Sequence, residues 1–159
     1  MENQLLILGL GNLLMGDEGL GVHFARAMEE AVLPENVTVL DGGTGGFHLM
    51  SYLEDYPVII AVDATLDERP AGTLRLIEPR FSKDFPRSLS THDIGLRDLI
   101  EGLQILGKMP KIYLFVVSID TVQPLYIGLS PEVGAVMPDL LQKVRKLAYE
   151  LSEQLVTMH

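Results

Sequence analysis

Three acidic residues and one histidine are the side chains of this sequence best suited to chemistry. Glu18 lies in a glycine-rich turn, Asp41 ends a short apolar run, and Asp63 follows a longer apolar run at residues 58–62. His92 stands at the expected start of a helix, where the dipole disfavours a protonated imidazole and favours the neutral form that binds metals. Carboxylates and an imidazole suit zinc, nickel, manganese or iron better than copper(I), so two of these carboxylates together with His92 predict a site for one such ion.

Asp63 gives the sharpest signal of the three acids. A carboxylate at the end of a buried strand must be paired, protonated or bound to a cation. No Lys or Arg lies within five residues of Asp63 along the sequence. Each acid taken alone has a structural alternative, because an acid that follows a strand often caps the next helix. For Asp41 a second role stays open, as a base or a substrate-positioning group near the metal.

The glycine-rich turn spans residues 9–21 and joins an expected strand to an expected helix. Turns of this kind often cradle phosphate with backbone N–H groups and a helix N-terminus. Asp17 and Glu18 stand at the tip of this turn and would repel a phosphate, so the turn favours a cation. The alternative is a nucleotide-binding domain, in which Asp41 would bind a ribose, but Leu14 occupies the third glycine position of that motif.

Hydrophobic periodicity predicts alternating strands and helices along the chain. Strands are expected at residues 5–10, 37–40, 58–62, 73–77 and 112–117, and helices at 18–32, 47–53, 92–106 and 131–157, with Ser130 as N-cap and Pro131 in the first turn of the last one. Continuous apolar strands such as 58–62 are typical of parallel sheets, whereas 73–77 alternates and indicates an antiparallel or edge strand.

This order predicts a single three-layer α/β domain over residues 1–159, with a mostly parallel twisted sheet of about five strands and helices on both faces. Ligands of such sheets bind outside the carboxyl ends of the strands. Glu18, Asp41 and Asp63 all follow strands, so we expect them at that one edge.

Composition excludes several classes of protein. The 159 residues carry a net charge of −10, which argues against nucleic-acid binding. The absence of cysteine excludes disulfides, thiol catalysis and thiolate metal sites, and fits a cytoplasmic protein. The apolar N-terminus lacks a preceding Lys or Arg and is followed by acids, so we expect neither a signal peptide nor a membrane span.

Five blocks of the sequence, taken in order, resemble the maturation endopeptidases of nickel–iron hydrogenases. They are Gly9-x-Gly11-Asn12-x-Leu14-x-x-Asp17-Glu18-x-x-Gly21, Asp41-Gly42-Gly43-Thr44, Asp63-Ala64, Ser90-x-His92-x-x-Gly95-Leu96 and Ile127-Gly128-Leu129-Ser130-Pro131. The resemblance covers nearly the whole chain. It implies a sheet flanked by helices, and it implies that Glu18, Asp63 and His92 are metal-binding residues.

The resemblance also implies an activity, the removal of a C-terminal peptide from the nickel-loaded precursor of a hydrogenase large subunit. In one scheme, these three residues recognise nickel that the precursor already holds. In the other, the chain binds its own nickel, zinc or other divalent metal, which lowers the pKa of a bound water. We favour the first scheme, with the chain acting as a cytoplasmic monomer. A nickel-binding maturation chaperone without protease activity is the alternative.

Overall fold

The computed structural model of the chain describes residues 4–86 and 95–158. Five strands form one sheet in the order β2-β1-β3-β5-β4. Their bounds are β1 Leu5–Gly9, β2 Val37–Asp41, β3 Val58–Thr65, β4 Leu74–Ile77 and β5 Lys111–Ser118. All neighbouring strands are parallel except β4, which pairs antiparallel with β5 at the edge of the sheet. The predicted fold class is confirmed, and so is the edge strand at 73–77.

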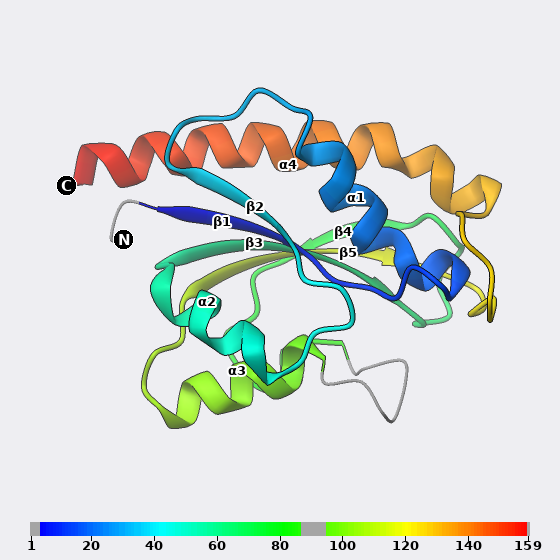
Figure 1. Ribbon diagram of the computed structural model, residues 1–159, viewed down its shortest axis with the longest axis horizontal. Helices are drawn as coiled ribbons and strands as arrows, with labels where there is room; N and C mark the ends of the chain where they lie inside the picture. The colour runs from blue at the N-terminus through cyan, green and yellow to red at the C-terminus, as the bar shows by residue number, and fades with distance from the viewer. Residues whose placement is uncertain (1–3, 87–94, 159) are drawn as a thin grey trace.

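Helices cover both faces of this sheet (Figure 1). They are α1 Leu20–Met28, α2 Met50–Asp55, α3 Leu96–Ile105 and α4 Pro131–Met158, and the short 3-10 turns are η1 Gly16–Gly19, η2 Phe47–Leu49 and η3 Ser82–Asp84. Helices α1 and α4 lie on one face, and α2 and α3 lie on the other. The three layers place the core on both sides of the central strands.

The central strands are apolar throughout because they are buried on both faces. In β1, Leu5 and Ile7 pack towards α1 and α4, whereas Leu6 and Leu8 pack towards α2 and α3. All four side chains are fully buried. Each such side chain contributes roughly 1.5–3 kcal/mol through the hydrophobic effect, which fixes the register of the strand.

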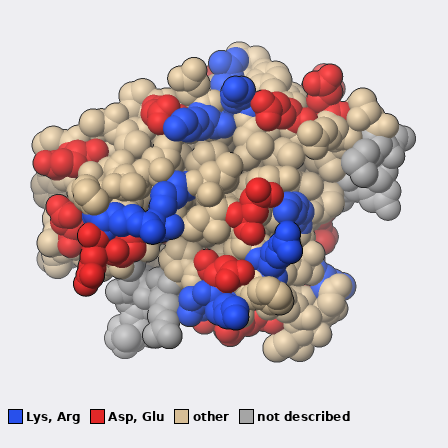
Figure 2. All heavy atoms as spheres, turned by 180° about the vertical axis from the view of Figure 1, so that it is seen from behind, with Lys and Arg blue, Asp and Glu red and all other residues tan. Residues whose placement is uncertain are grey.

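The longest helix is amphipathic. One side of α4 buries Val133, Leu140, Val144 and Ala148 against the sheet, and the other side carries charged residues such as Lys143. None of the described helices is long and apolar enough to cross a membrane. On the face seen from behind, acidic and basic side chains are interspersed, without a large patch of either sign (Figure 2).

Two predicted boundaries are wrong in ways that matter for the site. The first helix was expected from residue 18, but Gly16–Gly19 forms the 3-10 turn η1 and α1 begins at Leu20. The third strand was expected to end before Asp63, but β3 continues to Thr65 because β5 pairs with it as far as Ser118. Asp63 is therefore a residue within the strand.

Candidate metal centre

Close backbone contact between β1 and α1 positions the acidic turn. A Cβ atom added to Gly21 would lie 1.9 Å from the carbonyl oxygen of Leu10, and one added to Gly9 would lie 2.0 Å from the carbonyl oxygen of Gly21. Only glycine permits this approach, since each atom met is backbone. The helix therefore starts directly against the carboxyl end of β1, and η1, which carries Glu18, stays at that edge of the sheet.

The backbone N–H groups of the glycine-rich turn are already occupied. Leu10 donates its N–H to Val62 at 3.0 Å, Gly11 donates to Gly43 at 2.7 Å, and Asn12 donates to Glu18 at 3.2 Å, each to a carbonyl oxygen. A phosphate cradle needs such groups free to face the ligand. The nucleotide-binding alternative is therefore not supported, and the glycines serve packing.

Asp63 lies where β3 loses one of its neighbours. Strand β1 pairs with β3 only as far as Gly9 opposite Val62, so the following residue, Asp63, is the first without a β1 partner. Asp63 is partly buried, and its carboxylate accepts a hydrogen bond from the N–H of Ala64 at 2.8 Å. Asp63 thus lies just beyond the carboxyl end of β1.

Electrostatics ties Asp63 to Glu18. Burial raises the pKa of Asp63 from its ordinary value of 3.8 to about 7, the N–H of Ala64 opposes this rise, and the negative charge of Glu18 adds to it. Glu18 is itself only 9% exposed. The negative charge of Glu18 therefore acts on Asp63, and a divalent cation would relieve this repulsion. The donor chemistry fits the metal that the sequence implies.

The predicted third ligand, His92, lies outside the described residues. Within residues 4–86 and 95–158, no group of three or more Asp, Glu or His side chains gathers in a way that could hold an ion. The described part of the site is thus the pair Glu18 and Asp63. The role of His92 stays a prediction.

The structure places Asp41 on the other side of the sheet from Asp63. Asp41 lies level with Gly9, which lies level with Val62, so Asp41 shares the face of Val62 and not that of the adjacent Asp63. Its carboxylate accepts a hydrogen bond from the N–H of Gly43 at 3.0 Å and lies 3.8 Å from Nε of Arg26 in α1. Asp41 therefore lies at the expected edge of the sheet. Its side chain is on the face that α1 covers, where it accepts a hydrogen bond within a local turn and contacts Arg26.

Asp17 has a structural role that the sequence did not predict. It was expected at the tip of the turn beside Glu18, but it is only 2% exposed. Its carboxylate accepts hydrogen bonds from the N–H of Ser130 at 2.7 Å and from Nε2 of Gln123 at 3.3 Å, and its own N–H donates to Oε1 of Gln123 at 2.9 Å. Asp17 thus fastens the acidic turn to the segment before α4, at one end of the sheet (Figure 1).

The role expected for Ser130 also changes. Pro131 begins α4 as predicted, but the Ser130 hydroxyl is buried and has no hydrogen-bond partner among the described residues, so it does not cap the helix. The backbone N–H of Ser130 is what matters, because it binds Asp17. Gln123 and this N–H are the supporting groups that the sequence analysis did not identify.

Asp17→Ala tests this fastening. The substitution leaves the buried N–H of Ser130 and the Gln123 amide without their charged acceptor, so we expect it to destabilise the fold by about 2–4 kcal/mol. Asp17→Asn keeps one acceptor oxygen and should cost clearly less. Urea unfolding followed by circular dichroism measures both; equal losses would show that the carboxylate does not make these bonds.

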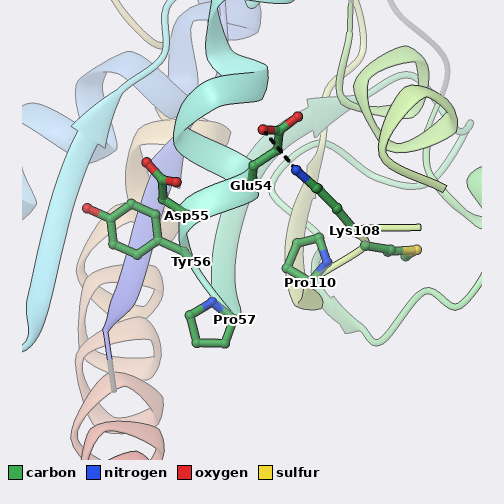
Figure 3. Close-up of a pocket in the computed structure, with 7 residues that line it drawn as sticks. Glu54, Asp55, Tyr56, Pro57, Lys108 and Pro110 are labelled. Carbon is green, nitrogen blue, oxygen red and sulfur yellow. Dashed lines mark ion pairs between the residues drawn. The ribbon is translucent and has the colours of Figure 1, made fainter. Parts of the chain in front are cut away.

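A pocket lies at the opposite end of the sheet from the acid pair. It has a volume of about 620 Å³ and is lined by Glu54, Asp55, Tyr56, Pro57, Lys108, Met109 and Pro110, just before β3 and β5 begin. Lys108 and Glu54 point towards one another across it, with Nζ and Oε2 3.9 Å apart (Figure 3). Since this pocket faces the amino ends of the strands, it does not contribute to the candidate metal centre.

The sequence of the chain matches those of known proteins. Residues 22–147 match the family model HycI, described as hydrogenase maturation protease. The hydrogenase 2 maturation protease of Escherichia coli K12 is 34% identical over 145 residues, which cover 89% of this chain and 88% of that protein. The HupD hydrogenase expression/formation protein of Bradyrhizobium diazoefficiens is 40% identical over 118 residues, but the match covers only 59% of its length.

The fold agrees with that of a solved relative. The structure of the E. coli hydrogenase maturating endopeptidase HybD superimposes with a TM-score of 0.83 at 32% identity, covering 92% of this chain and 93% of that one. The family match thus covers most of the chain, and the fold match covers 92% of it. This chain belongs to the hydrogenase maturation protease family.

Proposed function

We propose that the chain removes a C-terminal peptide from the precursor of a nickel–iron hydrogenase large subunit, and that Glu18, Asp63 and His92 recognise the nickel which that precursor holds. The observation that carries the proposal is the partly buried Asp63, whose pKa is raised to about 7 by burial and by the negative charge of Glu18. Two repelling carboxylates at the ligand-binding edge of a parallel sheet favour a divalent cation between them. Family membership supplies the reaction class, peptide-bond hydrolysis.

Each residue has a stated task in this proposal. Glu18 and Asp63 provide oxygen ligands and His92 a nitrogen ligand to the substrate's nickel, so that only a loaded precursor is held in place. When no cation is present, the Asp63 carboxyl is about half protonated at pH 7, and it must release that proton to bind. Recognition should therefore weaken as the pH falls below about 7. A role for Asp41 as a base or positioning group stays a prediction, and in the structure its carboxylate contacts Gly43 and Arg26.

We further propose that the chain acts as a monomer in the cytoplasm and uses nickel only as part of its substrate. A resident zinc or other divalent ion is the competing scheme, in which the ion would supply an activated water. Nickel-loaded and nickel-free precursors separate the two schemes. If the chain shortens both forms of the precursor at the same rate, it does not recognise the nickel of the precursor, and the competing scheme holds.

The direct test of the proposal uses His92→Ala beside the unmodified chain. Mass spectrometry of a nickel-loaded large-subunit precursor, before and after incubation, should show loss of a C-terminal peptide with the unmodified chain. With His92→Ala we expect the rate of processing to fall by more than about 100-fold. Substitution of a residue that only hydrogen-bonds to a metal ligand already lowers metal affinity or activity by about 10–100-fold, and loss of a ligand should cost more. Circular dichroism should show that the variant stays folded.

Other outcomes decide between the remaining readings. A variant that unfolds would show that His92 is structural, and a variant with the original rate would remove it from the site. If the unmodified chain binds nickel but never shortens the loaded precursor, the chain is a maturation chaperone without protease activity.

A further inference from the structure

Four large apolar side chains are exposed beside the acidic turn. They are Leu14, Leu125, Tyr126 and Ile127, which we call the apolar rim, and Leu125 is the most exposed of them at 89%. Leu14 belongs to the turn that carries Glu18, and the other three belong to the segment before α4. Exposed apolar residues that cluster in this way mark interaction sites more often than single ones do.

The backbone that carries the apolar rim is firmly held. Met15 and Tyr126 form a parallel β-bridge, in which the N–H of Tyr126 donates to the carbonyl of Leu14 at 3.0 Å and the N–H of Gly16 donates to the carbonyl of Tyr126 at 2.8 Å. Asp17 binds the same segment on both sides of the rim, at Gln123 and Ser130. The rim is thus a fixed surface joined to the acidic turn by main-chain hydrogen bonds.

Leu125 is an unusual residue for its position. Its φ angle of +57° is in the left-handed region, which costs a leucine roughly 1–2 kcal/mol and suits glycine or asparagine better. The side chain regains little of this through burial, because it is almost fully exposed. Folding therefore does not account for a leucine here, whereas contact with another molecule does.

We propose that the apolar rim is the surface on which the hydrogenase large-subunit precursor docks an apolar segment while its C-terminal region reaches Glu18 and Asp63. This inference rests on the proposed function. Leu14 and Glu18 are four residues apart in one turn, so a polypeptide at the acid pair has the rim within about 14 Å. Residues 121–131 carry no charged side chain, so the surface selects an apolar segment over an acidic or basic one.

The size of the apolar rim favours the precursor over a second copy of this chain. A stable dimer buries about 800 Å² on each partner, which is 20–30 residues. Four side chains fall well short of that, but they suffice as the apolar centre of a transient contact between an enzyme and a protein substrate, where a few residues carry most of the affinity.

Leu125→Asn tests the docking surface. Asparagine removes the apolar side chain but tolerates a positive φ, so the segment should keep its shape. Ile105→Asn is the matched control, because Ile105 is 86% exposed and ends α3 at the opposite end of the sheet. With nickel-loaded precursor, we expect Leu125→Asn to raise KM at least tenfold and to leave kcat within about twofold, while Ile105→Asn changes neither.

Separate measurements keep this inference distinct from the proposed function. If the unmodified chain cleaves the precursor and Leu125→Asn has the same KM as Ile105→Asn, the docking surface is refuted and the proposed function stands. If the unmodified chain binds the precursor without cleaving it, and Leu125→Asn weakens that binding tenfold, docking stands and proteolysis fails. Light scattering that shows a dimer dissolved by Leu125→Asn would instead assign the rim to a second copy.

Discussion

Asp63→Asn should abolish precursor processing and at the same time stabilise the metal-free protein at alkaline pH. The rate of processing should fall by more than about 100-fold, because the amide is a far weaker metal ligand than the carboxylate. Substitution of a residue that only hydrogen-bonds to a metal ligand already lowers metal affinity or activity by about 10–100-fold. Stability should rise because the amide carries no charge next to Glu18, and its oxygen can still accept the hydrogen bond from the N–H of Ala64.

The pH dependence of this stabilisation follows from the raised pKa. The folded protein binds the Asp63 proton more tightly than the unfolded chain does. The pKa of Asp63 is about 7 in the folded protein, and we take the ordinary value of 3.8 for the unfolded chain. The proton's contribution to stability is complete below pH 3.8, falls as the pH rises, and is lost above about 7. The full difference corresponds to at most about 4 kcal/mol, and partial exposure to water reduces our expectation to about 1–3 kcal/mol.

Urea unfolding at pH 5, 6, 7 and 8 measures this effect in metal-free protein. The gain of Asp63→Asn over the unmodified chain should grow across this range and level off above about pH 7. Asp55→Asn, at the far end of the sheet, is the control and should alter neither stability nor processing. A gain independent of pH would contradict the electrostatic account, and unchanged processing by Asp63→Asn would contradict the proposed role in recognition.

Gly21→Ala should damage the fold more than any surface substitution. The new Cβ would lie 1.9 Å from the carbonyl oxygen and 2.5 Å from the nitrogen of Leu10, and neither backbone atom can move aside without displacing α1 from β1. We expect a loss of about 3 kcal/mol or more, a large part of the 5–15 kcal/mol that stabilises a typical domain. Processing should also fall, because the displaced helix carries the turn of Glu18 with it.

Gly134→Ala is the matched control, since it makes the same substitution in another helix. A Cβ at Gly134 would contact only the Cβ of Leu129, at 3.9 Å. Alanine is the better helix former, so this variant should gain up to about 1 kcal/mol. Circular dichroism with urea unfolding gives both values. Changes of similar size and sign in the two variants would show that the contact with Leu10 does not decide the outcome.

The sequence predicted the fold well where burial acts on both faces of a strand. Runs such as 58–62 and 112–117 can be apolar throughout only if helices cover both sides of the sheet, and this alone leads to a parallel α/β domain. The alternating run at 73–77 likewise indicated an edge strand, which β4 is. These predictions depend on local pattern, so they needed no knowledge of which strands are neighbours.

Some details of the site depend on residues far apart in the sequence and could not be predicted from it. Asp17 and Glu18 have the same chemistry in sequence, but contacts with Gln123 and Ser130, more than 100 positions away, make Asp17 structural. Asp41 and Asp63 both follow apolar runs, and only the register of the three strands shows that their side chains leave opposite faces. His92 lies outside the described residues, so its role rests on the sequence.

The hydrogen bond between Asp17 and Ser130 spans 113 positions of the chain, and this separation has a consequence for biosynthesis. Ribosomes add roughly 5–20 residues per second, so Ser130 is made on the order of ten seconds after Asp17. Until then a nascent chain cannot close its N-terminal turn. The turn that carries Glu18 is therefore fastened only after Ser130 has been made, and a product terminated before that residue lacks this hydrogen bond.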